Sequence, residues 1–355
     1  MHNNNDTSER KRRTLRQTVR ISVRRSVESV RQQVDDAKHI NIPIMLWGVI
    51  ALLLFFGVLT DWRNFSTPNL LLVARNSSIL ILASIGMTMV ILVSQVDLSI
   101  GSVMSLSAAV AAIALQAGYG IAIALGVGLL SGVLVGLING ILVAVLRFDF
   151  WISTFATMGI GAGLALVILG GTMPMRDPFF RAIGTDKLFG IHYVVYLTAL
   201  IVCFIWFLLR CTKFGYNIYS IGGSEQAAHL SGVNVTFNRV AVFACSGFFA
   251  AVAGLTQAAM TTSANPIVGA TYSFDAMAAV IIGGTGFSGG KGGIWGTVFG
   301  AIALRVLAHG LAIMKVSSNW QKAIIGVVIV AVLVTDAVYT KMQNRKELRR
   351  VYSYE

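Results

Sequence analysis

The chain contains ten apolar segments, each close to the length that a helix needs to cross a lipid bilayer. They run approximately over 43–60, 70–95, 100–117, 120–146, 152–170, 192–209, 240–261, 273–288, 293–314 and 323–340. A helix rises about 1.5 Å per residue and a bilayer core is roughly 30 Å thick, so about 20 residues suffice. Only 12% of the 355 residues are charged, against about 25% in an ordinary soluble domain. The sequence predicts an all-α polytopic membrane protein of about ten transmembrane helices.

Two pairs of neighbouring segments are separated only by short joins rich in Gly or Ser, at 96–102 and 285–293. Irregular backbone at membrane depth is tolerated only where protein or a water-filled cavity surrounds it. These joins are therefore either breaks in re-entrant segments or plain connections between full spans.

Basic residues set the expected orientation. With the N-terminus inside, 20 of the 28 Lys and Arg fall in inner segments and six in outer ones, which agrees with the positive-inside bias. Both termini are then cytoplasmic. The sequence divides into a basic arm at 1–42, a transmembrane domain at 43–340 and a tail at 341–355. The net charge of +13 is explained by this topology, and no nucleic-acid partner is expected.

The N-terminal arm carries apolar residues at three- and four-residue steps among its arginines: Leu15, Val19, Val23, Val27, Val30 and Val34. This spacing is typical of a basic amphipathic helix, which would lie on the lipids of the inner leaflet. A disordered basic tail is the alternative.

The ten segments divide at the outer segment 171–191 into two sets of five, and an odd number per set inverts the second set. A 5+5 inverted repeat is one interpretation. The fourth and ninth segments carry corresponding glycine ridges, which allow close helix approach in lipid: Gly128, Gly132, Gly136 and Gly140, and Gly296 and Gly300. The alternative is that Gly is simply common in membrane helices.

No catalytic or metal-binding pattern is found in the sequence. The five His and three Cys have no metal-ligand spacing, so neither a metal nor a cofactor is expected. The run at 284–289 fits GxGxxG but has no βαβ context, and Gly292 stands where a Walker A loop needs Ser or Thr after Lys291. The chain is not expected to be an enzyme or to hydrolyse ATP.

Charges inside the spans give little support for a proton relay. Asp97, Asp275 and Asp336 lie near span ends, where water can reach them, whereas a relay needs carboxylates deep in the membrane. Arg75 and Arg305 fall inside spans and either snorkel or make structural bonds, with a pore role as the alternative.

The longest internal cytoplasmic loop is 210–239. The sequence Gly222-Gly223-Ser224 can turn the chain and cap a helix, Glu225 to Leu230 can form that helix, and Gly232 can end it. The segment is either a docking element or an ordinary structured loop.

Several motifs, in this order and these compartments, resemble the permease subunits of ribose- and galactose-type ABC importers over roughly 43–340. They are Val-Asp-Leu-Ser-Ile-Gly-Ser at 96–102, Gly-Gly-Ser-Glu-Gln-Ala-Ala-His-Leu-Ser-Gly-Val at 222–233, Phe-Asp-Ala-Met-Ala-Ala-Val-Ile-Ile-Gly-Gly-Thr at 274–285, Gly-Gly-Lys-Gly at 289–292 and Gly-Thr at 296–297. The chain departs from the family pattern at Ser94-Gln95-Val96 and Ser273-Phe274, which puts the exact sugar in doubt.

The resemblance implies an ABC importer permease fold in the inner membrane of a prokaryote. Its expected partners are an ABC ATP-binding subunit, an extracytoplasmic sugar-binding protein and a second copy of the chain. The expected coupling residues are Gly222, Gly223, Ser224, Glu225, Ala227, Ala228, Leu230 and Gly232. Small Ala227 and Ala228 would sit against a groove of the ATPase, and Glu225 would pair with one of its basic residues.

A polar but uncharged path suits a neutral polyol, whose hydroxyls need hydrogen-bond partners more than counter-charges. Candidate path residues are Asn76, Ser77, Thr88, Asp97, Asn139, Thr154, Phe155, Thr157 and Asp275. Phe155 either stacks on a sugar or gates the path, or else faces lipid or core. The alternative functions are an ion-coupled secondary transporter and an intramembrane enzyme.

Overall fold

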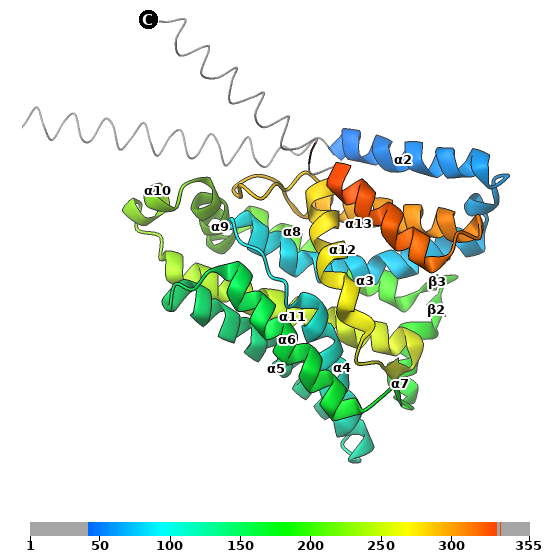
Figure 1. Ribbon diagram of the computed structural model, residues 1–355, viewed down its shortest axis with the longest axis horizontal. Helices are drawn as coiled ribbons and strands as arrows, with labels where there is room; N and C mark the ends of the chain where they lie inside the picture. The colour runs from blue at the N-terminus through cyan, green and yellow to red at the C-terminus, as the bar shows by residue number, and fades with distance from the viewer. Residues whose placement is uncertain (1–41, 332–333, 335–355) are drawn as a thin grey trace, which may run out of the picture.

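The computed structural model describes residues 42–331 and 334, a part of the chain that is almost entirely helical (Figure 1). The helices are α2 (Ile42–Leu59), α3 (Thr67–Leu92), α4 (Ile100–Gln116), α5 (Ile121–Gly140), α6 (Phe150–Leu169), α7 (Pro178–Thr185), α8 (Tyr193–Cys211), α9 (Lys213–Gly223), α10 (Glu225–Leu230), α11 (Val235–Thr261), α12 (Tyr272–Ile282) and α13 (Ile294–Ile313). Another helix follows over 318–331. Short turns of helix are η1 (Arg63–Phe65), the π-helical η2 (Ile141–Val145) and η3 (Val268–Thr271).

Four two-residue strands form two antiparallel pairs. β1 (Met173–Pro174) pairs with β4 (Ser263–Ala264), with Met173 opposite Ala264. β2 (Lys187–Leu188) pairs with β3 (Ile191–His192), with Lys187 opposite His192. The predicted amphipathic arm, the tail and Asp336 lie outside the described residues.

Six described helices are long and apolar enough to cross a bilayer: α3, α6, α8, α11, α13, and α5 continued through η2. The structure has shorter helices than expected at the spans 100–117 and 273–288, because α4 has 17 residues and α12 has 11. At about 1.5 Å per residue, neither reaches across a core of roughly 30 Å. Helix α12 stops short of the predicted residue 288 because Gly283 and Gly284 follow, and Gly284 has a φ of +80°. The described residues confirm a membrane-crossing helical chain but not a count of ten.

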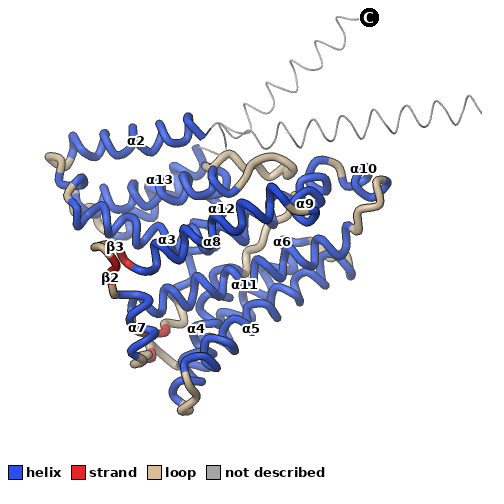
Figure 2. The backbone as a smooth tube through the Cα atoms, turned by 180° about the vertical axis from the view of Figure 1, so that it is seen from behind, coloured by secondary structure: helices blue, strands red, loops and turns tan. Residues whose placement is uncertain are grey.

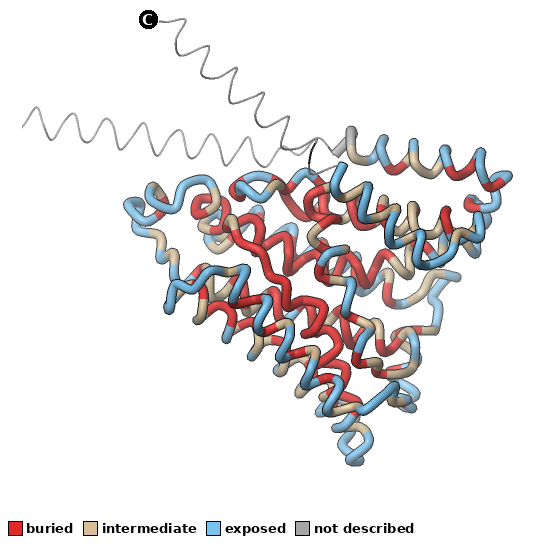
Figure 3. The backbone as a smooth tube through the Cα atoms, in the orientation of Figure 1, coloured by how far each residue is buried: buried red, intermediate tan, exposed pale blue. Residues whose placement is uncertain are grey.

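The chain between α3 and α4 is a non-helical segment, residues 93–99, with turns at both ends and an extended middle, and it runs through the interior of the molecule (Figure 3). The turn out of α3 places Ser94 at a φ of +61°. Apart from the half-buried Ser94, every residue of the segment is buried, as backbone without helical hydrogen bonds must be in a membrane. The expected join at 96–102 is therefore a true break.

A second break lies between α11 and α12 and includes β4 and η3 over 262–271. This break was not expected. The expected join at 285–293 is instead a loop between α12 and α13. The breaks are joined through the short helices that follow them: the Gly101 amide of α4 donates to Ser273 Oγ of α12 (2.9 Å), and the Ser273 hydroxyl donates to the Leu98 carbonyl of the first break (2.7 Å). The Gly269 amide donates to Ser105 Oγ (3.1 Å) in return.

Two long helices, α3 and α11, form the centre and pack on each other. Helix α5 packs on α11, whereas α13 packs on α3. Figure 2 shows α2 and α13 along one edge of the molecule and α5 and α6 along the other. A methyl group at Gly132 or Gly136 of α5 would overlap the carbonyl oxygen of Gly247 or Phe243 on α11. The predicted close approach along the glycine ridge is thus confirmed.

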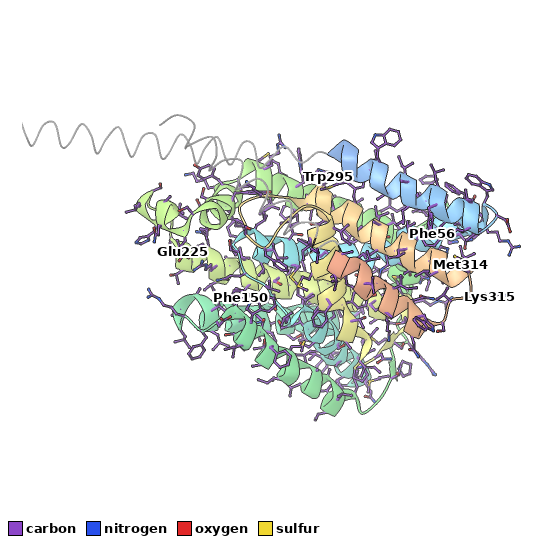
Figure 4. The ribbon with its side chains drawn as sticks, turned by 45° about the horizontal axis from the view of Figure 1, so that its top comes forward. Phe56, Phe150, Glu225, Trp295, Met314 and Lys315 are labelled. Atoms are coloured by element: carbon purple, nitrogen blue, oxygen red, sulfur yellow. The ribbon has the colours of Figure 1, made fainter. Side chains whose placement is uncertain are left out.

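The molecule has two distinct ends, marked in Figure 4 by Glu225 and by the pair Met314 and Lys315. We call them the α10 end, which carries α9, α10 and the 283–293 loop, and the α7 end, which carries α7 and the strand pairs. Arg75 holds the α7 end together, since its Nη2 donates to the carbonyls of Gly184 (2.9 Å) and Met260 (3.1 Å). This is the structural bond that the sequence analysis gave as one role for Arg75.

Candidate functional site

The first candidate site is a buried polar network centred on Asp97, in the extended segment that leads into α4. Asp97 is only 1% exposed. Its Oδ1 accepts from the backbone amide of Ser99 (2.9 Å) and from the Ser99 hydroxyl (2.6 Å), and its Oδ2 accepts from the Ser246 hydroxyl of α11 (2.7 Å). Hydrogen bonds to a carboxylate are short and strong. Three donors therefore hold this carboxylate without any cation among the bonded partners.

The network continues across two further helices. Asn139 at the end of α5 donates from Nδ2 to Ser99 Oγ (2.9 Å), and Thr157 of α6 donates to Asn139 Oδ1 (2.8 Å). Asn139 lies two residues before the π-helical turn η2, a distortion that is frequent at functional sites. The chain Thr157, Asn139, Ser99, Asp97, Ser246 thus links α6, α5, the first break and α11 through polar side chains alone.

The structure brings together three of the predicted path residues, Asp97, Asn139 and Thr157, and separates the others. Thr154 is buried one turn before Thr157, and its hydroxyl donates to the Phe150 carbonyl (2.7 Å). Thr88 shares a hydrogen bond of 2.7 Å with Thr297 of α13. Phe155 is 61% exposed on the outer face of α6.

Asn76 and Ser77 lie toward the α7 end of α3, apart from this network. Ser77 Oγ is buried and has no hydrogen-bond partner.

Sequence reasoning missed Ser99, Ser246 and Thr297 as members of polar contacts. Ser99 had a usable signal, because Ser two residues after Asp is the spacing of an Asx turn. Thr297 had one too, because it belongs to the Gly-Thr motif at 296–297. Ser246 had none, since it is a small polar residue in an apolar helix and its partner is far away in the chain.

A second, looser cluster forms around Asp275 in the first turn of α12. The nearest cation is Arg305 of α13, with Nη2 3.5 Å from Asp275 Oδ2. The guanidinium carbon of Arg305 also lies 5.3 Å from the ring centroid of Tyr272. Asp275 is therefore placed apart from the Asp97 network and has a charged partner instead of hydroxyl partners.

At the α10 end, α9 and α10 form the compact element expected at 210–239. The Ser224 hydroxyl accepts from the Ala227 amide (3.3 Å), as predicted for a helix cap. The carboxylate of Glu225 is held by both terminal nitrogens of Arg239, at 3.0 and 2.6 Å. The expected pairing of Glu225 with a partner subunit therefore competes with a bond inside the chain.

Helix α10 exposes a different face from the one expected. Ala228 is 3% exposed and belongs to the hydrophobic core of the chain itself, so it cannot lie in a partner's groove in this conformation. Leu230 is 87% exposed and Phe237, early in α11, is 65% exposed. Ala228 lies on the inner side of this six-residue helix, so the expected contact of Ala228 with the ATPase stays a prediction, and its burial does not favour that contact.

Helix α9 packs on the end of α3 and on the 283–293 loop, and that loop bonds in turn to the first break. The Gly290 amide donates to the Leu92 carbonyl (2.9 Å), and a methyl group at Gly222 would overlap both of those residues. The Tyr219 hydroxyl donates to the Gly292 carbonyl (3.0 Å) and Ser94 donates to the Ser288 carbonyl (2.8 Å). Burial raises the pKa of Tyr219 to about 12, so its hydroxyl stays a donor throughout the physiological range.

The α7 end carries a surface hollow between α7 and the start of β4. Its lining includes Arg176, Asp177, Arg181, Asp186 and Thr262. A neighbouring hollow at the α4–α5 turn shares Arg176 and Asp177 and adds Tyr119. Charges of both signs gather at this end, opposite the Leu230 face.

Comparison with known proteins places these features in a family. Residues 69–333 match the family described as the permease component of branched-chain amino acid transport systems. The chain is 38% identical to the ribose import permease protein of Haemophilus influenzae over 78% of this chain and 88% of that protein. It is 33% identical to the galactose/methyl galactoside import permease protein of Salmonella typhimurium, over 82% and 93% of the two chains. It is 32% identical to the D-allose transport system permease protein of Escherichia coli, over 88% of this chain and 98% of that protein.

Among solved structures, the chain is similar to a metal-chelate-type ABC transporter in an inward-facing conformation. The TM-score is 0.46 and the identity 18%, over 84% of this chain and 99% of the other. A likeness of this size supports no argument about function.

Proposed function

The chain belongs to the family of ABC importer permease components, and on that premise we propose that it forms the path by which an ATP-driven importer moves a monosaccharide or related neutral polyol across the inner membrane. ATP hydrolysis belongs to a separate subunit. The observation that carries the proposal is the likeness to sugar import permeases. The Asp97 network adds that hydroxyl, amide and carboxylate groups from four elements meet inside the bundle. Such groups match the hydroxyls of a sugar.

The proposal includes ten spans arranged as two inverted sets of five. Its support is the packing pattern, because exchanging the halves turns the α5–α11 contact into the α13–α3 contact and the α4–α11 contact into the α12–α3 contact. Each half also has a long helix followed by a break and a short helix, and the first of the two breaks is buried almost throughout. Broken helices that meet near the bilayer midplane are typical binding sites in transporters built from inverted repeats.

The α10 end is proposed to face the cytoplasm, with both termini, and to dock the ATP-binding subunit. The docking contact would be Leu230 with Phe237 rather than Ala228, because these are the exposed apolar residues of the element. The lock of Gly222 and Tyr219 onto residues 92 and 290–292 would carry movement of the docked helix into the first break.

The α7 end is proposed to face outward and to receive the sugar-binding protein at the hollow lined by Arg176 and Arg181. A second copy of the chain would complete the importer as a homodimer, with lipid around the remaining apolar faces. The Gly222, Gly223, Ser224 and Gly232 positions would shape the coupling element without contacting the ATPase.

Reconstitution tests the function. Proteoliposomes that contain the chain, its ATP-binding subunit and its binding protein are expected to take up radiolabelled D-ribose, D-galactose or D-allose only with ATP. Omitting the ATP-binding subunit should abolish uptake, while ionophores should leave it unchanged. Uptake driven by an ion gradient without ATP would establish the secondary-transporter alternative, which the relatives do not support.

Substitution tests the docking face. Leu230→Asp is expected to reduce co-purification of the ATP-binding subunit at least tenfold, because it places a charge at the centre of an apolar contact. Ile123→Asp, an exposed apolar position at the α7 end, is the matched control. Equal recovery of the ATP-binding subunit from both variants would contradict the assignment of Leu230.

A further inference from the structure

The cluster of Tyr272, Asp275 and Arg305 has unused hydrogen-bonding capacity. Strong charge-assisted hydrogen bonds measure about 2.7–2.9 Å, so the 3.5 Å separation of Arg305 Nη2 and Asp275 Oδ2 is an ion pair held slightly apart. Both Nε and Nη2 of Arg305 are buried without a hydrogen-bond partner, and so is Nε2 of His309, one turn further along α13. This cluster presents donors that no acceptor of the described chain satisfies.

The cluster can also be reached from outside the chain. The side chains of Arg305 and Asp275 keep 20% and 22% of their surface exposed, while the Tyr272 hydroxyl reaches back to Gln257 of α11 (3.4 Å). Charged side chains in membrane helices face the protein interior or a water-filled cavity. The exposed edge of the ion pair is therefore expected to border a polar space rather than lipid.

The ion pair of Asp275 and Arg305 lies beside the second break. Asp275 is in the first turn of α12, directly after the second break, where the two halves meet through Ser273. The Asp97 carboxylate is buried in the bundle and accepts three hydrogen bonds. Of the two aspartates beside the breaks, only Asp275 is partly exposed and can be reached by another partner.

A pair of adjacent sugar hydroxyls fits such an opening. One hydroxyl donates to the Asp275 carboxylate, and its neighbour accepts from the exposed part of the Arg305 guanidinium. We propose that Asp275 and Arg305 form a binding station for the vicinal hydroxyls of the transported sugar, with Arg305 as a specificity-determining residue. This inference rests on the proposed function and extends it to a ligand contact on the second half of the chain.

The decisive experiment removes the ion pair without leaving a lone charge. The double variant Arg305→Met with Asp275→Leu is reconstituted with the ATP-binding subunit and the binding protein, and uptake of D-ribose, D-galactose and D-allose is measured beside ATP hydrolysis. We expect uptake of the transported sugar to fall at least tenfold while binding-protein-stimulated ATP hydrolysis stays within twofold. Wild-type uptake by the double variant would mean that the pair is only structural and would overturn the proposal.

The variant Arg305→Lys decides the matter if the double variant does not assemble. Lysine keeps the charge but loses the fork of donors, so the relative uptake rates of the three sugars are expected to change at least threefold. Unchanged rates and ratios would overturn the proposal. Lys315→Met, which removes a cation just beyond α13, is the matched control and should match wild type. A wild-type complex that imports none of the three sugars contradicts the proposed function itself.

Discussion

The two halves of the chain each break a span near the centre of the molecule, and they stabilise the break differently. In the first half, Asp97 is buried and bonded by two hydroxyls and an amide from within the bundle. In the second half, Asp275 faces a cation at 3.5 Å and remains partly exposed. A buried carboxylate that accepts three hydrogen bonds fixes its surroundings, whereas a partly exposed carboxylate with a single ion partner can exchange partners. We therefore expect the first half to stay rigid around Asp97 and the second half to change contacts at Asp275 during transport.

Substitution of the two aspartates should give the largest difference in stability between the two halves. Asp97→Ala leaves three buried donors unsatisfied, at about 1–3 kcal/mol each, so we expect a large loss of folded protein. Asp275→Ala leaves Arg305 without its ion partner but partly exposed, and the loss should be clearly smaller. Thermal unfolding of detergent-solubilised protein measures both. Equal melting temperatures for the two variants would mean that the halves do not differ in this way.

The contact between Gly101 of α4 and Gly269 of the second break should be equally sensitive to substitution of either glycine. A methyl group at Gly101 overlaps the Gly269 carbonyl, and a methyl group at Gly269 overlaps that of Gly101. Overpacking of this kind costs about 1–3 kcal/mol, so both Gly→Ala variants should lower the melting temperature. Gly126→Ala is the control, because that position of α5 opens onto free space. A stable Gly101→Ala beside an unstable Gly269→Ala would show that the start of α4 can shift while the second break cannot.

A moderate effect on coupling is expected when the hydrogen bond between α9 and the 283–293 loop is removed. Tyr219→Phe removes the hydroxyl that donates to the Gly292 carbonyl, a bond worth about 0.5–1.5 kcal/mol. The importer should still assemble, but more ATP should be hydrolysed per sugar imported. Tyr216→Phe on the same helix, where the side chain is 37% exposed, is the control. A stoichiometry that Tyr219→Phe leaves unchanged would contradict the lock as a link between the α10 end and the first break.

The smallest effect belongs to the ion pair of Glu225 and Arg239. Both side chains reach the surface, at 53% and 18% exposure, and exposed pairs contribute about 0–1 kcal/mol. Glu225→Gln should therefore shift the melting temperature little, and less at high salt. A larger loss than that of Tyr219→Phe would show that the α10 end depends on this charge more than on the lock.

The sequence was informative where a pattern was local. Apolar length located the long helices, the four-residue glycine spacing identified the α5 seam, and Ser224 with Glu225 marked the start of α10. It failed where a distant partner decides the outcome. The side of α10 that faces inward is fixed by the core around Ala228, and Glu225 finds Arg239 fourteen residues later.

The second break shows the same limit. Residues 262–271 contain a single Gly and a single Ser and resemble an ordinary loop between two spans. The contact of Gly269 with Gly101 is made across more than half of the transmembrane domain. Similarly, Asp97 and Asp275 look alike as aspartates near span ends. Only the hydroxyls of Ser99 and Ser246, brought together by folding, distinguish a closed carboxylate from an open one.

The bond between the Gly290 amide and the Leu92 carbonyl has a consequence for how the protein is made. Ribosomes add about 5–20 residues per second, so Gly290 emerges roughly 10–40 s after Leu92. Throughout that interval the end of α3 and the extended segment behind it are synthesised but lack the partner that closes them. The nascent chain must keep these backbone groups hydrated or shielded by the insertion machinery, and the first half can reach its final packing only near the end of translation.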